Sequence, residues 1–387
     1  MDRLIFGIVF LVLLGSCSSS SDLVSSQTKE VQFQLIDSLV VESLLDLYLV
    51  GKSKESGQYL FKDKSVKEVF LTDSKGKVLA LPLLRGEGPD QVATPWEIGF
   101  AGNEIAVKEF SAESKIHFFD VSFKKTHVSA PLSAGMNSLE VAPTRNGLSY
   151  VEFEDKRLLI GSDANVISPD LMAEGQQNPG FYAKAKSGFA IDIESGEVQN
   201  WNIYPDAWPP KKDGNWVGQS RPFLAVTSKK NVIGILPRIG DQLFFFQLKD
   251  DDLIPIGETI INHPERKRGL VFDPEDEPLL YPSFFDLKAG GSFFLIHFYT
   301  EVPKDLYLPM KAQGTTNAKN PEFLELLRKT RRSKYILVDE SGNQAPVSKL
   351  PIEGQVHYID ADDIIYIKPD TKDEKDYNVF YRYRVKM

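Results

Sequence analysis

The sequence has little cysteine and histidine and no excess of positive charge. Of its 387 residues only Cys17 is a cysteine and five are histidines, and the formal net charge is −9. A single cysteine excludes an internal disulfide and a zinc site built from thiolates. An acidic chain lacks the positive charge that neutralises phosphates, so nucleic acid is not expected as a partner.

Recognisable catalytic motifs are also missing. No two of the histidines have the short spacing of a zinc motif, and the G-x-S-x-G turn of many serine hydrolases does not occur. Carboxylate pairs such as Asp192 with Glu194 stand in segments rich in turn residues, and sequence alone does not show whether such pairs lie at a glycosidase distance. The sequence therefore predicts no catalytic residue, no metal site and no cofactor.

The only long apolar run, Leu4 to Leu14, is too short to cross a bilayer and ends in Leu14-Gly15-Ser16-Cys17. The segment resembles a bacterial lipobox, which implies cleavage after Ser16 and acylation of Cys17. An ordinary secretory signal cut at the same place is the alternative. We expect a signal peptide at 1–16, a lipidated flexible tether at 17–30 and a folded domain at 31–387, in an outer-membrane lipoprotein that faces either the periplasm or the outside.

The folded part reads as short β-strands joined by hairpins. Runs of four to eight residues rich in Val, Ile, Phe and Tyr recur along it, bounded by Gly, Asp, Asn or Ser. Acidic turns separate many of them, as at Asp73, Asp120, Asp192 and Asp339, because an Asp carboxylate accepts backbone amides and a following Gly supplies positive φ.

The hairpins repeat with a period near 45 residues, which is typical of a β-propeller. The fold class expected is all-β, a single propeller of six blades, or seven if Gly180 to Pro205 forms its own blade; an irregular pair of β-sandwiches is the alternative. The expected blade starts are near Leu45, Trp96, Leu139, Ser220, Tyr281 and Val356. Strands near the two chain ends, Val31 to Ile36 and Val379 to Val385, are expected to close the ring.

One segment breaks the β pattern. Residues 320–332 begin with Asn320 and Pro321, carry early acids and late bases, and place apolar residues on one side. They predict a short amphipathic helix inserted in the blade that begins near Tyr281. Its basic end, Arg328 to Lys334, suits either anionic head groups or polysaccharide, or complements the dipole of its own helix.

A family resemblance rests on residues 86–120. Gly86, Gly88 and Pro89 form a G-x-G-P turn, Pro95 precedes a strand, and Lys115, Ile116, Phe119 and Asp120 follow an x-K-I-x-x-F-D pattern. This stretch resembles the repeat of six-bladed propeller lipoproteins of the NHL/TolB-like kind, although Lys108-Glu109 stands where the repeat has Asp. The resemblance implies a propeller fold and an envelope location, and implies little about activity.

The segment from Trp201 to Trp216 holds three of the four tryptophans. Aromatic faces beside polar groups are used by sugar and peptide sites, and the alternative is a long loop whose aromatics pack against the next blade. The residues considered for ligand binding are Trp201, Tyr204, Trp208 and Trp216, with Arg221 and Arg85 as nearby bases.

The function expected from these features is an envelope-anchored binding or scaffolding module for a protein or a glycan. The alternatives are a hydrolase or lyase acting on polysaccharide in the propeller funnel, and a structural partner in an outer-membrane complex. The membrane is expected as a partner through the lipid on Cys17.

Overall fold

Six antiparallel four-stranded sheets make up the part of the chain that the structure describes. The structure is a computed structural model and describes residues 31–132, 144–145, 147–163, 180–218, 221–269, 272–273, 278–370 and 375–387. The predicted signal peptide, the tether with Cys17 and the blade starts predicted near Leu139 and Ser220 lie outside the described residues.

The sheets follow one another along the chain, and only the sixth takes a strand from the other end of the sequence. Blade 1 contains β2 (Tyr48–Lys52), β3 (Tyr59–Lys62), β4 (Val69–Thr72) and β5 (Val78–Ala80). Blade 2 contains β6 (Pro95–Ala101), β7 (Glu104–Glu109), β8 (Ile116–Phe119) and β9 (Lys125–Val128). Blade 3 contains β10 (Leu148–Phe153), β11 (Lys156–Ser162), β12 (Gly188–Asp192) and β13 (Val198–Trp201).

Blade 4 contains β14 (Phe223–Val226), β15 (Ile233–Leu236), β16 (Gln242–Lys249) and β17 (Asp252–Ile260). Blade 5 contains β18 (Phe284–Ala289), β19 (Phe293–Tyr299), β20 (Ser333–Asp339) and β21 (Gln344–Val347). Blade 6 contains β22 (Gly354–Ile359), β23 (Ile364–Pro369), β24 (Tyr377–Lys386) and, from the start of the chain, β1 (Gln32–Glu42).

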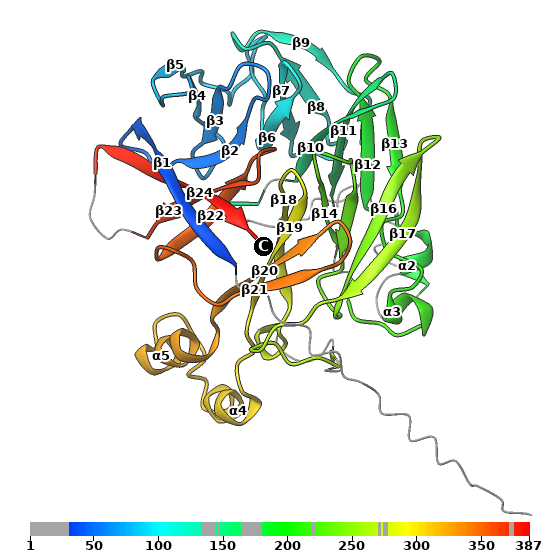
Figure 1. Cartoon of the computed structure of the whole chain (residues 1–387), viewed down its shortest axis with the longest axis vertical. Coiled ribbons are helices and arrows are strands. Elements are labelled where there is room, and N and C mark those ends of the chain that lie inside the picture. Colours follow the sequence, from blue (N-terminus) through cyan, green and yellow to red (C-terminus); the bar gives the residue numbers. More distant parts are fainter. Residues whose placement is uncertain are drawn as a thin grey trace, which may run out of the picture.

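The first strands of the blades contact one another in the closed order β2, β6, β10, β14, β18, β22 and back to β2. They therefore surround a common axis, and Figure 1 shows the blades arranged about one centre. The prediction of a six-bladed propeller is confirmed. Gly180 to Pro205 supplies β12 and β13 and so completes blade 3 rather than forming a seventh blade.

The ring closes where the two chain ends pair. In blade 6, β1 is antiparallel to β24, with Phe33 opposite Val385 and Leu39 opposite Phe380. The pairing of the two terminal segments expected from sequence is confirmed, and β1 extends it beyond Ile36 to Glu42. Because blade 6 draws on both ends, the ring cannot open without breaking this ladder.

The hydrophobic core consists of layers between neighbouring blades. The largest cluster joins blades 4 and 5 through residues such as Phe245 and Phe294, whose ring centroids are 5.9 Å apart. Equivalent clusters fill the other five interfaces. Each sheet thus buries its two faces only against its neighbours, which is the packing that makes the repeat stable.

Acidic turns end the third strand of several blades, as the sequence predicts. In the β4–β5 turn the Asp73 carboxylate accepts the amides of Lys75 and Lys77 at 2.8 and 3.0 Å. Asp120, Asp192 and Asp339 accept backbone amides in the corresponding turns of blades 2, 3 and 5. These carboxylates therefore shape hairpins.

Helices are few in the described ranges, and the longest two form one insertion between β19 and β20. They are α4 (Lys304–Ala312) and α5 (Pro321–Thr330), which project from one side of the ring in Figure 1; shorter pieces are α2 (Phe181–Lys184), α3 (Pro209–Lys212) and a 3₁₀ turn at Pro278–Leu280. The predicted helix is α5, and Asn320 caps it by accepting the amides of Glu322 and Phe323. None of these helices has both the length and the apolar character needed to cross a bilayer.

Candidate functional site

Polar side chains gather at the end of the propeller where the first strand of each blade begins. The second strand of each blade is antiparallel to the first, so it ends beside that start. In blade 2, for example, Lys108 near the end of β7 lies 3.1 Å from the Glu97 carboxylate near the start of β6. We refer to this region as the polar end of the propeller.

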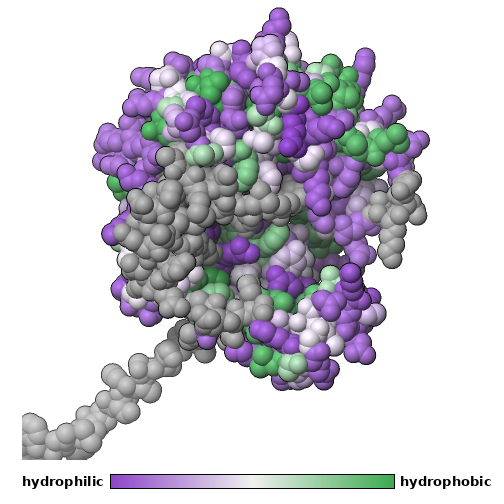
Figure 2. All heavy atoms as spheres, turned by 180° about the vertical axis from the view of Figure 1, so that it is seen from behind, coloured by the Kyte–Doolittle hydropathy of each residue, from purple (hydrophilic) through white to green (hydrophobic). Residues whose placement is uncertain are grey.

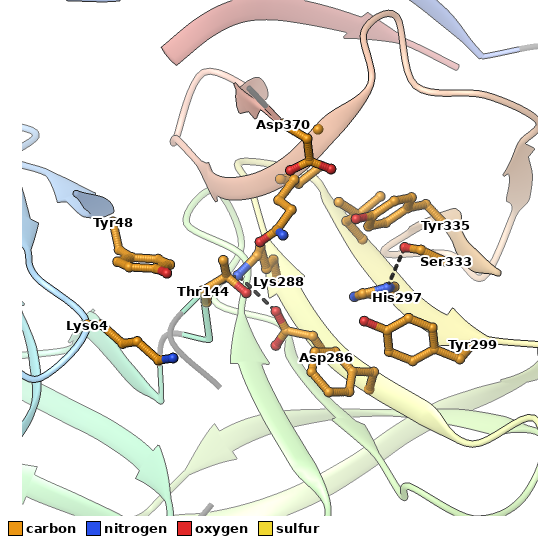
Figure 3. A pocket seen from close by; sticks show the side chains of 15 residues that line it. Tyr48, Lys64, Thr144, Asp286, Lys288, His297, Tyr299, Ser333, Tyr335 and Asp370 are labelled. Carbon is orange, nitrogen blue, oxygen red and sulfur yellow. Dashed lines mark hydrogen bonds and ion pairs between the residues drawn. The ribbon is translucent and has the colours of Figure 1, made fainter. Parts of the chain in front are cut away.

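A pocket of about 410 Å³ opens at the polar end and is lined by residues of blades 1, 5 and 6 and by Thr144, which precedes blade 3. We call it the axial pocket, because the starts of three first strands, β2, β18 and β22, contribute to it. Its lining residues are Tyr48, Lys64, Thr144, Phe285, Asp286, Lys288, Leu295, His297, Tyr299, Ser333, Tyr335, Gly354, Gln355, Val356 and Asp370. Figure 3 shows Tyr48 and Lys64 on one side and the blade 5 residues His297, Tyr299 and Tyr335 on the other.

One wall of the axial pocket is a cluster of aromatic rings on blade 5. The His297 ring stacks on Tyr335, with centroids 4.7 Å apart at an interplanar angle of 22°, and lies 4.9 Å from Tyr299. Phe285 packs edge-on against both His297 and Tyr299 at 5.1 Å. Across the pocket, Tyr48 of blade 1 stacks on His357 of blade 6 at 5.4 Å.

His297 is held in its neutral form. Burial lowers the pKa of its imidazole to about 4, and Lys288 and Arg145 act in the same direction while Asp286 opposes them. Its Nε2 and the Ser333 hydroxyl share a hydrogen bond of 2.7 Å (Figure 3). A neutral imidazole accepts or donates a hydrogen bond according to its tautomer, and a hydroxyl can do both. The His297–Ser333 pair can therefore present both a hydrogen-bond donor and an acceptor to the pocket.

The charged groups in the pocket form a compact network. Lys288 Nζ lies 2.9 Å from Asp286 Oδ2 and also donates to the Thr144 carbonyl. The Arg145 guanidinium lies 3.9 Å from the same carboxylate, donates to the Phe285 carbonyl at 2.6 Å and covers the Phe223 ring at 4.6 Å. Asp286 therefore lies between two cations.

A lysine, Lys62, is buried close to Lys288 of the pocket. The Lys62 side chain is 6 % exposed, and within the described residues its ammonium group has no hydrogen bond or ion pair. Burial lowers its pKa, with repulsion from Lys288 and Lys108 added and attraction to Glu97 opposing. The pKa of His357 is likewise far below its usual value, through burial first and then through Lys368, Lys288 and Lys62.

The aromatic residues predicted as a ligand site pack into the protein. Trp208 is 1 % exposed and donates from Nε1 to the Ile239 carbonyl at 2.9 Å. Tyr204 and Trp216 join it in a cluster with Phe181 and Tyr182 of α2, beneath blades 3 and 4. These rings therefore pack as in the alternative considered from sequence, a long loop whose aromatic residues lie against the next blade. Their role in binding a ligand stays a prediction.

Three other predicted residues lie apart from that cluster. Trp201 ends β13 and donates from Nε1 to the Asp251 carbonyl at 3.1 Å. Arg221 lies at the polar end, where it donates to the Ser162 carbonyl at 3.0 Å and lies 3.6 Å from Asp163. Arg85 is exposed in the turn before blade 2. All three lie where a fourth strand ends or leads into the next first strand, which is the polar end, but none of them lines the axial pocket.

Sequence reasoning missed the pocket residues themselves. Tyr48, Asp286 and Gln355 each stand within a few residues of a predicted blade start, near Leu45, Tyr281 and Val356. The strand start is therefore the signal that locates them, because every first strand begins at the same end of the ring.

No three His, Cys, Asp or Glu side chains gather into a group that could hold a metal ion within the described ranges. The aromatic wall, the neutral His297 and the polar side chains of the pocket suit a polar organic ligand, which stacks on rings and forms hydrogen bonds.

Comparison with known proteins gives a structural likeness only. No protein family model matches the chain, and no curated protein matches it. A member of the DUF4221 family from Bacteroides vulgatus superposes with a TM-score of 0.60 at 12% sequence identity, covering 93% of this chain and 99% of that one. The two proteins share a fold.

Two further solved structures resemble the chain more weakly. A protein of Bacteroides fragilis described as exported has 10% identity and a TM-score of 0.49, with 95% of this chain and 98% of that chain covered. A gluconolactonase of Xanthomonas campestris has 9% identity and a TM-score of 0.45, with 93% and 96% covered. At these identities neither carries information on activity.

Proposed function

We propose that this chain is a lipid-anchored envelope protein that binds a saccharide in the axial pocket. The observation that carries the proposal is the composition of the pocket, where aromatic faces stand beside hydrogen-bonding groups. Tyr48, Tyr299 and Tyr335 provide the rings, while Ser333 and Gln355 provide neutral polar atoms. The C–H faces of sugars pack on such rings and their hydroxyls need donors and acceptors at fixed places.

The size of the pocket supports the same proposal. At about 410 Å³ it falls within the usual range for small-molecule sites and has room for one or two sugar rings. Its walls come from three blades, so the rings are held by the sheet cores behind them. A preformed site of this kind costs little ordering on binding.

The binding test uses the chain from Ser18 onward, since every described strand lies beyond residue 30. The chain is screened on a glycan microarray and bound glycans are measured by titration calorimetry. Tyr48→Ala is expected to weaken binding about tenfold through the loss of one stacked ring. Tyr377→Ala, at a partly exposed tyrosine of β24, is the matched control and should bind as wild type. Retained affinity in Tyr48→Ala would contradict the site.

The lipid anchor is supported by the sequence Leu14-Gly15-Ser16-Cys17, and the described domain begins after a further polar stretch. Mass spectrometry of the protein purified from membranes is expected to find cleavage before Cys17 and acyl chains on it. Cys17→Ser should abolish the acylation and release the protein from the membrane fraction. An unmodified Cys17 would refute the anchor without affecting the binding proposal.

Cleavage of a polysaccharide is the second candidate, and Asp370 favours it. The pKa of this pocket carboxyl is raised by burial and by Glu353, as expected of a group that donates a proton to a leaving oxygen. Glycans that bind are therefore incubated with the protein and analysed for shortened products. Products that disappear in Asp370→Asn would establish an enzyme, and intact glycans would leave binding alone.

A further inference from the structure

A strip of basic side chains runs over blades 4 and 5 at the polar end, next to the axial pocket. It comes from loops and strand starts that meet there: the ends of β15 and β17, the end of α5 and the start of β20. We call it the basic strip, and it consists of Arg238, Lys267, Arg268, Arg331, Arg332 and Lys334.

Cations outnumber the acids that pair with them in part of the basic strip. Arg332 and Lys334 share the single carboxylate of Glu265, and Lys267 lies 2.7 Å from Glu301. Three of the basic side chains thus share two acids, although the whole chain has a net charge of −9. The Glu265 pKa is lowered by its hydrogen bond to Lys334 and by both cations, so this acid remains ionised.

Arg331 connects the basic strip to the pocket. Its guanidinium lies over the Tyr299 ring at 5.1 Å, and Tyr299 lines the pocket. Burial and the neighbouring Arg238 lower its pKa, and no carboxylate contributes to the shift. Within the described part of the chain the guanidinium has no hydrogen bond or ion pair, so its five N–H donors are available to a ligand.

The insertion that carries Arg331 stands out from the ring. In Figure 2 the lobe at the lower right, formed by α4 and α5, carries many hydrophilic residues on its outer surface. Phe323 and Tyr307, with ring centroids 6.3 Å apart, pack with Val302 after β19 and with the 3₁₀ turn Pro278–Leu280, and so hold both helices against these segments. The end of α5, and with it Arg331, is therefore fixed beside the pocket mouth.

We infer that the ligand of the axial pocket is an acidic glycan longer than the pocket, whose carboxylate or sulfate groups lie along the basic strip. This inference rests on the proposed saccharide binding and adds the charge and length of the ligand. A planar guanidinium pairs with a carboxylate or sulfate through two parallel hydrogen bonds, which a neutral sugar cannot form. The bound sugar occupies the aromatic wall, and the next acidic residue of the polymer meets Arg331.

The experiment compares acidic and neutral glycans on the chain from Ser18 onward. The probes are hexamers of galacturonic acid, sulfated chondroitin oligosaccharides and neutral galactose hexamers, measured by calorimetry at 50 and 500 mM NaCl. Acidic glycans are expected to bind at least tenfold more tightly than neutral ones at low salt, and to lose that advantage at high salt because exposed charges are screened. Arg331→Leu should weaken acidic binding about tenfold and leave neutral binding unchanged.

Controls separate this inference from the proposed function. Arg384→Leu removes an exposed arginine of β24 and should bind every probe as wild type. If neutral hexamers bind as tightly as acidic ones and Tyr48→Ala weakens both, saccharide binding stands and the acidic ligand is refuted. If a poly-glutamate peptide of equal charge binds as tightly as the acidic glycans, the strip attracts any polyanion and the glycan assignment fails. If no glycan binds at all, both proposals fall.

Discussion

The ammonium group of Lys108 in blade 2 lies 2.5 Å from the Asp163 carboxylate in blade 3, and both side chains are almost fully buried. Glu97 approaches the same ammonium at 3.1 Å, and Arg221 lies 3.6 Å from Asp163. Blades 2 and 3 and the segment that leads into blade 4 are thus joined by charge at the polar end. Burial disfavours the Lys108 cation, yet its pKa is raised because Asp163 and Glu97 together outweigh that cost.

This arrangement predicts an asymmetric response to substitution. Asp163→Asn removes the stronger partner and leaves a buried cation poorly compensated, at a cost of about 3–5 kcal/mol in the free energy of unfolding. Lys108→Met should cost less, because Asp163 keeps Arg221 and the methionine fills the space. Urea unfolding measures both, with Lys156→Met in the half-exposed Lys156–Asp251 pair as the control, which is expected to unfold like wild type. An equal effect of Asp163→Asn and Lys156→Met would contradict the prediction.

The closing ladder of blade 6 gives a second prediction. Leu39 of β1 is 2 % exposed and belongs to the layer between blades 6 and 1, whereas its neighbour Val40 is 42 % exposed. Leu39→Ala is expected to lower the free energy of unfolding by about 2–5 kcal/mol, since it leaves a cavity at the ring closure. Val40→Ala should change it by less than about 1 kcal/mol. Equal effects of the two substitutions in denaturant unfolding would mean that β1 does not seal the ring.

The fold was largely predictable because its signals are local. Each acidic turn, such as that at Asp73, encodes a hairpin in about six residues, and the period of these turns gives the blades. Asn320 and Pro321 mark α5 in the same way. The preceding helix α4 was not predicted, since it contains Pro309 and exposes Leu306 and Leu308, which hides an amphipathic pattern.

The candidate site was not predictable because it depends on contacts between distant blades. Tyr48 and Tyr335 face one pocket only after the ring has closed, and neither stands in a motif. The aromatic composition of the segment around Trp208 predicts a ligand site. In the structure, Tyr182 and Tyr281 from other parts of the chain pack with this segment in a buried cluster. Composition shows how many aromatic residues a segment contains, but their exposure to solvent depends on tertiary packing, which the segment alone does not reveal.

His297 predicts a pH dependence of stability. Its pKa falls from the usual 6.5 to about 4 in the folded protein, so the unfolded chain binds more protons between these values. Stability must therefore decrease as the pH falls from 6.5 towards 4, by roughly 1–2 kcal/mol for this partly exposed group. His357 and His263 have lowered pKa values too and add to the decrease. The measurement is the difference between wild type and His297→Gln in urea unfolding at both pH values, and an identical decrease in the two proteins would exclude this role.

The cap of α5 links local helix stability to the basic strip. The Asn320 side chain accepts the amides of Glu322 and Phe323 at 2.9 and 3.1 Å, and the helix ends next to Arg331. Asn320→Ala is expected to cost the helix about 1 kcal/mol, seen as faster hydrogen exchange of the α5 amides while the strand amides stay protected. Because Arg331 is then less firmly placed, acidic glycans should bind several-fold more weakly and neutral glycans as before. Lys319→Ala alters the exposed residue next to the cap and is the control, expected to match wild type in exchange and in binding. Faster exchange without any loss of acidic binding would show that α5 does not position Arg331.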